Sequence, residues 1–142
     1  MIIRPELLSE DFKYRIKIPL RFADIDAFGH VNNAIYLTYF EIARSSYWDE
    51  IIEWNWDEAG IIIRRSMVDY LKPITLSDEI YAYVSTSRIG NSSFDLEYIL
   101  VKLIDGKEEI CTSGETMCVT YDYKSHKPIP IPLKQKIKMG EN

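Results

Sequence analysis

The sequence predicts a two-layer α+β domain in which one long helix packs on one antiparallel sheet. Three observations predict it: a helical period from Asn33 to about Glu50, one strand pattern before that stretch, and four strand patterns after it. A helix and a sheet that are each apolar on one side must bury those sides against each other, which gives two layers. The length of 142 residues fits a single domain that spans residues 1–142.

A polar loop separates the first strand from the helix. Apolar and polar residues alternate from Tyr14 to Phe22, as in a half-buried strand, and Pro19 favours an edge position for this strand. The next stretch, Asp24 to Asn33, consists of small and polar residues with one glycine, which is typical of a loop. Apolar residues then recur at steps of three and four, which indicates the helix.

The four later strands are expected to form an antiparallel meander. Their patterns cover Ile61–Leu71, Ile80–Ser87, Phe94–Ile104 and Glu109–Tyr121. Asp105-Gly106 is a strong signal for a two-residue hairpin between the last two strands. Strands of ten or more residues favour a sheet that curls around the helix. Three prolines after Lys127 cannot continue a ladder, so we expect an irregular tail from about residue 124.

Composition argues against several classes of protein. Lys and Arg total 17 against 22 for Asp and Glu, so the overall basic charge of a nucleic-acid-binding protein is missing. No apolar run has the length of a signal peptide core or a membrane span, so we expect no membrane association. Cys111 and Cys118 lie seven residues apart in one strand pattern, which predicts opposite faces and two reduced thiols. These features together predict a cytoplasmic protein.

The most informative stretch joins the first strand to the helix. It contains Asp24-x-Asp26-x-x-Gly29, and His-Val-Asn-Asn follows directly at residues 30–33. The stretch strongly resembles the 4-hydroxybenzoyl-CoA thioesterase-like branch of the hotdog superfamily, whose members carry such an element between the first strand and a long central helix. The order of elements agrees over nearly the whole chain, and a Tyr-x-x-Pro follows the second strand at residues 70–73.

The resemblance implies both a fold and an assembly. The fold is the hotdog fold, a five-stranded antiparallel sheet wrapped around one central helix. The assembly is a homodimer whose sheets join edge to edge with active sites at the interface, or a homotetramer formed as a dimer of such dimers. The catalytic carboxylate of the family matches Asp26, and the backbone N–H that polarises the thioester carbonyl matches Asn33.

Some relatives hold the CoA phosphates with Arg or Lys in the turn between the third and fourth strands. Only Arg88 is charged in that turn here. Backbone N–H groups around Gly90 and Asn91, with Ser92 beside them, are the other candidates for this contact.

The chemistry of a thioester agrees with this assignment. Its leaving group is a thiolate whose conjugate acid resembles a cysteine thiol, with a pKa of about 8.5, so it departs without strong acid assistance. One carboxylate and one oxyanion donor therefore suffice. The unpaired N–H groups and the positive dipole end of a helix N-terminus suit a developing oxyanion, and Asp26 lies in the loop that leads to that terminus. The residues leave open whether Asp26 is a general base or a nucleophile.

Several neighbouring residues are secondary candidates. Gly29 allows the backbone to approach the substrate closely, and His30 is expected to orient the loop backbone or Asp26. Asn32 and Asn33 are expected helix caps, one of which also contacts substrate. Tyr36 belongs to the helix core, to the acyl pocket, or to both.

Asp24 is expected to stabilise the loop or to pair with Arg21. No Cys, His and carboxylate spacing suits a metal, so no metal site and no cofactor are predicted.

Three functions remain open from the sequence. The leading one is acyl-CoA thioesterase, an enzyme that hydrolyses an acyl-CoA thioester to the free acid and CoA. The alternatives are a thioesterase for acyl groups on acyl carrier protein and a non-catalytic acyl-CoA-binding hotdog module. No phosphate-binding glycine loop and no Gly-x-Ser-x-Gly setting are present, which excludes nucleotide hydrolysis and disfavours a serine nucleophile.

Overall fold

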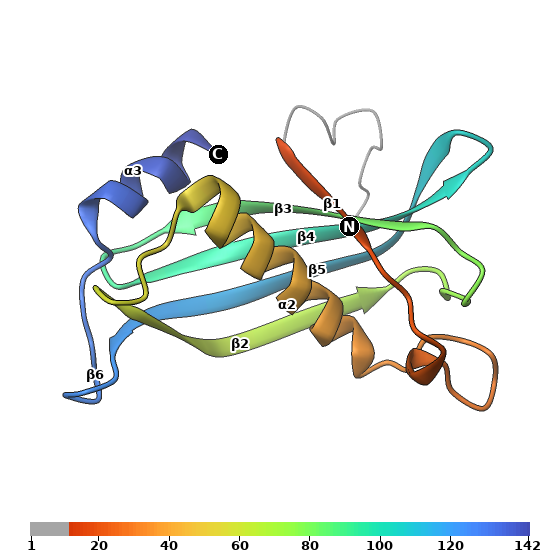
Figure 1. Ribbon diagram of the computed structural model, residues 1–142, viewed down its shortest axis with the longest axis horizontal. Coiled ribbons are helices and arrows are strands. Elements are labelled where there is room, and N and C mark those ends of the chain that lie inside the picture. Colours follow the sequence, from red (N-terminus) through yellow and green to blue (C-terminus); the bar gives the residue numbers. More distant parts are fainter. Residues whose placement is uncertain (1–11) are drawn as a thin grey trace.

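The computed structural model describes residues 12–142, and Figure 1 shows one long helix lying across one face of a curved sheet. The elements follow the predicted order as far as the fifth strand. They are β1 (Tyr14–Ile18), a 3-10 turn η2 (Phe22–Asp24), α2 (Ile35–Tyr47), a π-helical turn η3 (Trp48–Ile52), β2 (Gly60–Tyr70), β3 (Ile80–Ile89), β4 (Ser93–Ile104), β5 (Lys107–Asp122), β6 (Lys127–Pro128) and α3 (Leu133–Glu141).

The sheet is antiparallel with the strand order β1-β3-β4-β5-β2, and the short β6 pairs with β5. The predicted α+β fold and the curled sheet are therefore confirmed. The Asp105-Gly106 hairpin is confirmed too, because both residues have positive φ angles, 51° and 78°. The meander holds only for β3, β4 and β5. The prediction that β2 neighbours β3 is wrong, because residues 71–79 are long enough to carry the chain to the far edge.

The core lies between α2 and the sheet. Tyr36, Tyr39 and Phe40 of α2 are each at most 2% exposed. Alternate side chains of β4 face the helix and pair with β5 residues: Phe94 with Cys118, Leu96 with Thr116, Tyr98 with Gly114, and Leu100 with Thr112. Phe40 stacks on Tyr98 with ring centroids 4.3 Å apart. A Cβ on Gly114 would lie 2.3 Å from the Phe40 ring, so helix and sheet approach most closely where a glycine stands.

The ends of two early elements differ from the prediction. β1 stops at Ile18, directly before Pro19, which has no N–H to donate to a ladder. The helix begins at Ile35 and its cap position is Ala34, without a side-chain cap. The Asn32 amide oxygen instead accepts a hydrogen bond from the Ala34 N–H at 2.9 Å, in the turn that precedes the helix.

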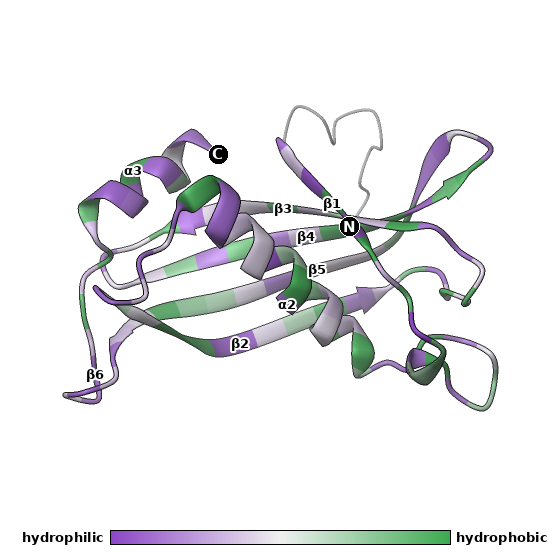
Figure 2. Ribbon diagram, viewed as in Figure 1, coloured by the Kyte–Doolittle hydropathy of each residue, from purple (hydrophilic) through white to green (hydrophobic). Residues whose placement is uncertain are grey.

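The prediction of an irregular C-terminal tail is wrong. Residues 127–128 form β6 and Leu133–Glu141 form α3, which packs against β3 and η3. Figure 2 shows α3 as a largely hydrophilic helix, yet its Gln135 and Met139 are buried. Pro132 occupies the N-cap position, where a missing N–H costs nothing.

Both cysteines are buried and free, but the prediction of opposite faces is wrong. Leu100 pairs with Thr112 and Val101 with Ile110, so Cys111 is the extra residue of a β-bulge. The bulge turns Cys111 to the helix side, where it shares one core cluster with Cys118. Burial raises the pKa of the Cys111 thiol to about 11 and that of Cys118 to about 12, which keeps both protonated.

Within residues 12–142, none of the helices combines the length and the apolar character needed to cross a bilayer. The cytoplasmic location stays a prediction of the sequence.

Candidate active site

The motif loop between β1 and α2 folds as a tight hairpin. The Asp26 N–H donates to the His30 carbonyl at 2.8 Å, the Gly29 N–H donates to the Asp26 carbonyl at 3.1 Å, and Ile25 and Val31 form an antiparallel bridge. Gly29 has a φ of +84°, in the left-handed region that side chains rarely adopt. The hairpin therefore places Asp26 at the first position of its closing turn.

Asp24 is buried and pairs with Arg21, a pairing that the sequence predicted. It is 1% exposed and pairs with the Arg21 guanidinium at 2.8 Å, while the Tyr39 hydroxyl donates to its second oxygen at 2.8 Å. Burial alone would raise the pKa of the Asp24 carboxyl, but the hydrogen bonds from Arg21 and Tyr39 outweigh it and hold the pKa below its ordinary value. Both carboxylate oxygens of Asp24 accept hydrogen bonds that stabilise the fold.

Asp26 differs from Asp24 in its exposure and in its hydrogen bonds. It is partly exposed, and its Oδ1 accepts hydrogen bonds from the backbone N–H groups of Phe28 at 2.9 Å and His30 at 3.2 Å. Its Oδ2 accepts none from the part of the chain that the structure describes. One oxygen orients the carboxylate, and the other is free for chemistry.

One backbone N–H at the start of α2 is also free. The Asn33 N–H has no hydrogen-bond acceptor among residues 12–142, whereas the Ala34 N–H donates to the Asn32 side chain and the Ile35 N–H to the Asn32 carbonyl. The carbonyl of Asn33 accepts from the Tyr70 hydroxyl at 2.9 Å. A free N–H at a helix N-terminus is the donor that an oxyanion needs.

A pocket of about 240 Å³ is lined by both Asp26 and Asn33. Its lining residues are Asp26, His30, Val31, Asn33, Tyr36, Tyr70, Leu71, Lys72 and Pro73. The Tyr36 and Tyr70 rings meet edge to face with centroids 4.8 Å apart and form an aromatic wall. Burial raises the pKa of Tyr36 to about 12, so its hydroxyl stays protonated.

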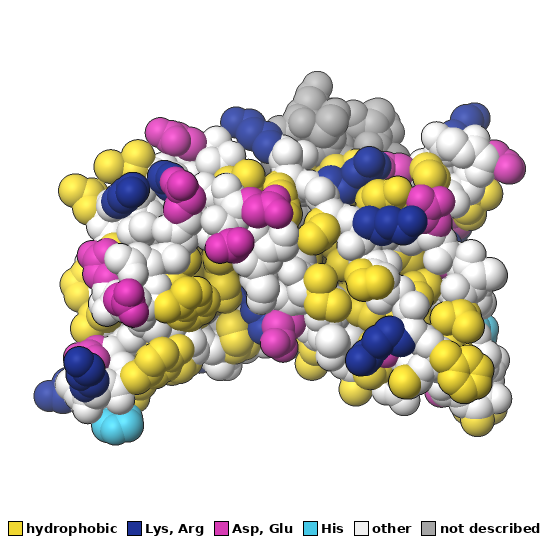
Figure 3. Space-filling model, viewed as in Figure 1, with side chains coloured by type: hydrophobic (Ala, Val, Ile, Leu, Met, Phe, Trp, Pro, Cys, Tyr) yellow, Lys and Arg dark blue, Asp and Glu magenta, His cyan; other side chains and the backbone are white. Residues whose placement is uncertain are grey.

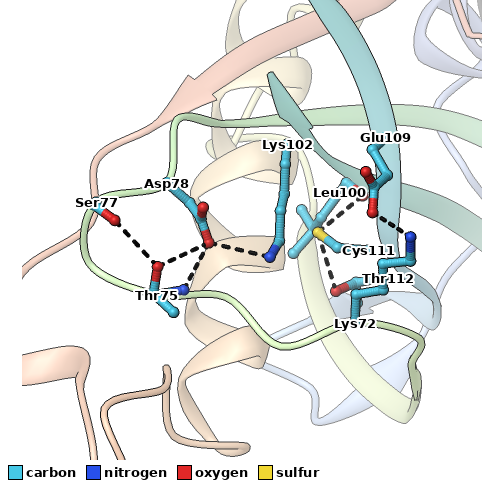
Figure 4. A network of polar contacts seen from close by, with 9 residues as sticks. All are labelled: Lys72, Thr75, Ser77, Asp78, Leu100, Lys102, Glu109, Cys111 and Thr112. Atoms are coloured by element: carbon cyan, nitrogen blue, oxygen red, sulfur yellow. Dashed lines mark hydrogen bonds and ion pairs between the residues drawn. The ribbon is translucent and has the colours of Figure 1, made fainter. Parts of the chain in front are cut away.

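The second wall of the pocket comes from the connection between β2 and β3. The Ile74 carbonyl accepts the Val31 N–H at 2.8 Å, and the N–H groups of Leu71 and Lys72 both donate to the Cys111 carbonyl at the bulge. Figure 4 shows how Asp78 holds the rest of this connection: it accepts from the Thr75 N–H at 2.8 Å and pairs with Lys102 at 3.2 Å.

Lys72 pairs with Glu109 of β5 in the same network. The pocket walls are therefore fixed by polar contacts from β4 and β5.

The structure brings together four of the residues singled out in the sequence, namely Asp26, His30, Asn33 and Tyr36. Gly29 and Asn32 shape the loop and the turn behind them. The imidazole of His30 is exposed, and the hydrogen bond from His30 to Asp26 comes from its backbone N–H. Residues 70–73 line the pocket, although sequence reasoning gave them no role. The sequence feature that indicates these residues is the Tyr-x-x-Pro, which is part of the family pattern.

The β3–β4 turn lies at the opposite end of the molecule from the motif loop (Figure 1). Arg88 makes two bonds to the Asp95 carboxylate, at 2.7 and 3.0 Å, and a third to Ser93. The Gly90 N–H donates to the Ser93 carbonyl at 2.7 Å. The Asn91 carbonyl accepts from Ile131, and the Ser92 carbonyl from Thr120. These contacts hold the turn, β5 and the segment that precedes α3 together, and a role for the turn in CoA binding stays a prediction.

No group of three or more His, Cys, Asp or Glu side chains within the described residues 12–142 is arranged to hold a metal ion. Independence from metals and cofactors stays a prediction.

Comparisons with known proteins identify the family of this chain. The sequence profile of the Thioesterase-like superfamily matches residues 20–138, which include the motif loop and every pocket residue. The uncharacterized protein YsmA of Bacillus subtilis is 30% identical over 119 residues, 83% of this chain and 79% of its own length.

Two solved structures are similar over nearly their whole length. A thioesterase from Thermus thermophilus, crystallised with coenzyme A and Zn, is 33% identical with a TM-score of 0.80, covering 93% of this chain and 95% of its own. The PA5185 protein of Pseudomonas aeruginosa is 28% identical with a TM-score of 0.83, covering 93% and 92%. The chain therefore belongs to the thioesterase-like superfamily and is a thioester hydrolase with the hotdog fold.

Proposed function

We propose that the protein hydrolyses acyl-CoA thioesters to the free acid and CoA in the pocket beside α2. The observation that carries this proposal is the pairing of Asp26, which has one free carboxylate oxygen, with the free N–H of Asn33 on the wall of one 240 Å³ pocket. The Thermus thermophilus relative was crystallised with coenzyme A, which supports CoA as the carrier.

The two groups divide the chemistry between them. The thioester carbonyl oxygen accepts the Asn33 N–H, whose strength as a donor is increased by the positive end of the helix dipole. In the general-base route, the free Asp26 oxygen takes a proton from water as the water oxygen bonds to the carbonyl carbon. The C–S bond then breaks, and the proton passes from Asp26 to the departing CoA thiolate. In the nucleophilic route, the same oxygen attacks the carbonyl carbon, the C–S bond breaks to release the CoA thiolate, and a mixed anhydride with Asp26 remains. Water then hydrolyses this anhydride to the free acid and restores the Asp26 carboxylate.

The neighbouring residues support this pair. The Phe28 and His30 N–H groups hold the first carboxylate oxygen of Asp26 in the turn that Gly29 allows, which leaves the second oxygen for the substrate. Asn32 binds the turn that leads into α2, and Tyr36 forms the wall on which the acyl group rests. For the CoA end, Arg88 with the Gly90-Asn91-Ser92 turn remains our candidate phosphate contact, and because this turn lies at the far end of the protomer, it would serve the pocket of the partner subunit.

The test compares the two loop aspartates. Asp26→Asn keeps the shape and the acceptor of the N–H bonds but removes the base or nucleophile, so kcat should fall about 10²–10⁴-fold. Asp24→Asn is the matched control, because it removes a carboxylate two residues away that has no free oxygen. Its kcat at saturating acyl-CoA should stay within a few-fold of the parent.

Thiol release should be measured on both variants after melting and size confirm that they are folded. Full activity of Asp26→Asn would refute the carboxylate mechanism. The same assay on an acyl-CoA panel and an acylated carrier protein decides the substrate class. Faster turnover of the carrier would move the assignment to acyl carrier protein, and binding without any turnover would indicate a non-catalytic module.

We also propose that the active form is a homodimer joined along β2. This strand forms the sheet edge, and five large apolar side chains at it are 38–51% exposed: Ile62, Ile63, Met67, Tyr70 and Leu71. Phe22 and Phe28 of the motif loop are 84% and 86% exposed, and Figure 3 shows hydrophobic side chains gathered at this end of the face that carries α2. A fully active monomer in ultracentrifugation would contradict the proposal. Pairing of dimers into tetramers would appear in the same experiment.

We expect hydrolysis to need no metal. Exhaustive chelation should leave kcat unchanged, and loss of activity that a divalent ion restores would reveal a metal site.

A further inference from the structure

We propose that Tyr70 is a positioning residue that aims the oxyanion-donating N–H of Asn33, an inference that rests on the proposed function. Tyr70 is the last residue of β2, on the edge strand, and its hydroxyl donates to the Asn33 carbonyl at 2.9 Å. Its ring packs edge to face on Tyr36, with an interplanar angle of 86°. The hydroxyl therefore bridges the sheet edge and the backbone that leads into α2.

The proposal follows from the hydrogen bonds of the two peptide units that meet at Asn33. In the first unit, the Asn32 carbonyl accepts the Ile35 N–H at 2.9 Å, and the Asn33 N–H is free. In the second unit, the Ala34 N–H donates to the Asn32 side chain at 2.9 Å, and the Asn33 carbonyl accepts from Tyr70. Three of the four polar groups are held. Because each peptide unit is planar, the bond to the Asn32 carbonyl orients the Asn33 N–H directly, and the two bonds on the second unit restrict rotation about the Asn33 backbone torsions that join the units.

The helix cannot supply the bond that Tyr70 makes. In a regular α-helix the Asn33 carbonyl would accept from the Leu37 N–H, four residues on. The Leu37 N–H instead donates to the Ala34 carbonyl at 3.3 Å, as in a 3-10 turn. Without Tyr70, water would satisfy the exposed Asn33 carbonyl, but water would not hold the peptide plane in one orientation.

Tyr70→Phe tests the proposal because it removes the hydroxyl and keeps the ring against Tyr36. Deleting an oxyanion donor typically costs about 10²–10³-fold in kcat. Loosening the donor should cost less, about 10-fold in kcat. KM should stay within about two-fold of the parent, and so should the Kd of a CoA thioether analogue, which lacks the carbonyl oxygen. The pH profile should keep its shape.

Tyr123→Phe is the matched control at the other end of β2. The Tyr123 hydroxyl also bonds the backbone, donating to the Ile61 carbonyl at 2.8 Å and accepting its N–H at 3.1 Å. This variant should lower the melting temperature without changing kcat. A second readout is the order parameter of the Asn33 amide by NMR, which should fall in Tyr70→Phe and stay unchanged in Tyr123→Phe.

A Tyr70→Phe variant with parental kcat, or with a parental Asn33 order parameter, would overturn the proposal. A loss confined to KM and to thioether binding would also overturn it, because Tyr70 would then bind substrate directly. Failure of the proposed function would appear elsewhere, as full hydrolysis by Asp26→Asn, and the NMR readout would still report whether Tyr70 holds the Asn33 peptide.

Discussion

The two ends of α2 are built on different principles. At the N-terminal end the stabilising contacts are hydrogen bonds between exposed loop residues, and a carboxylate oxygen and an N–H are left free. At the C-terminal end the helix widens into the five-residue π-helical turn η3, whose Trp48 and Ile52 are 5% and 0% exposed. Tyr36 is buried at the first end as well, so what distinguishes that end is a carboxylate oxygen and a backbone N–H without partners in residues that line the pocket.

The C-terminal end is held by aromatic packing and by α3. Trp54 donates its indole N–H to the Ala59 carbonyl at 3.0 Å, and its ring lies 6.1 Å from that of Phe94. Glu53 has a φ of 55°, and its carbonyl accepts from the Gln135 amide at 3.0 Å. We infer that stability resides at this end and catalysis at the other, so substitutions at the two ends should change different quantities.

The largest expected effect on stability is at Trp54. Trp54→Ala removes a side chain that is 8% exposed, together with its hydrogen bond, and should lower the free energy of unfolding by about 3–5 kcal/mol. Chemical denaturation monitored by circular dichroism measures this loss. Below its melting temperature, the folded variant should keep a kcat within a few-fold of the parent. A selective loss of kcat would show that the two ends are coupled.

Asp24 tests the boundary between the two roles, because it lies in the catalytic loop but is buried. Asp24→Asn loses charge-assisted hydrogen bonds to Arg21 and Tyr39 and should cost about 1–3 kcal/mol of stability. The effect should depend on pH. The folded-state pKa of Asp24 is lowered, so the unfolded chain binds the proton first as the pH falls below about 4.

The contribution of Asp24 is therefore complete above that range and is lost as the pH falls through the folded-state pKa. Urea midpoints at several pH values between neutrality and acid measure it. A parent–variant difference that stays constant down to the lowest pH would contradict this account.

The smallest expected effect is at Lys138, whose ion pair with Glu53 links α3 to η3. The Glu53 side chain is 58% exposed, so solvent screens the pair, and Lys138→Ala should cost less than about 1 kcal/mol. Melting temperatures in low and high salt measure it, and the difference between parent and variant should shrink in high salt. A larger, salt-independent loss would indicate that Lys138 packs rather than pairs.

Sequence reasoning succeeded where the information is local. The motif residues Asp26 and Asn33 meet in the pocket because a short loop and the start of a helix join them along the chain. Tyr70 was missed as a functional residue, because its bond to Asn33 depends on β2 forming the sheet edge beside α2. Strand patterns do not determine which strands are neighbours. For the same reason we expected β2 to pair with β3, whereas it pairs with β5.

The C-terminal helix was missed because its pattern is inverted. The buried row of this segment is Ile131, Gln135 and Met139, whereas Leu133 and Ile137 are 71% and 54% exposed. The buried row contains a polar residue, and the apolar side with leucine and isoleucine faces away from the core, so the pattern does not mark the buried side. The prolines before the segment also favour a loop. Gln135 is buried because its amide bonds the Glu53 carbonyl, a contact 82 residues away in sequence.

The close approach of Phe40 to Gly114 has a consequence for how such proteins diverge. Any side chain at position 114 would overlap the Phe40 ring and approach the Met67 carbonyl to 3.0 Å. A lineage can therefore replace the glycine only after position 40 has already become smaller. The two sites should covary among descendants of this chain, and the order in which their mutations are accepted should be constrained.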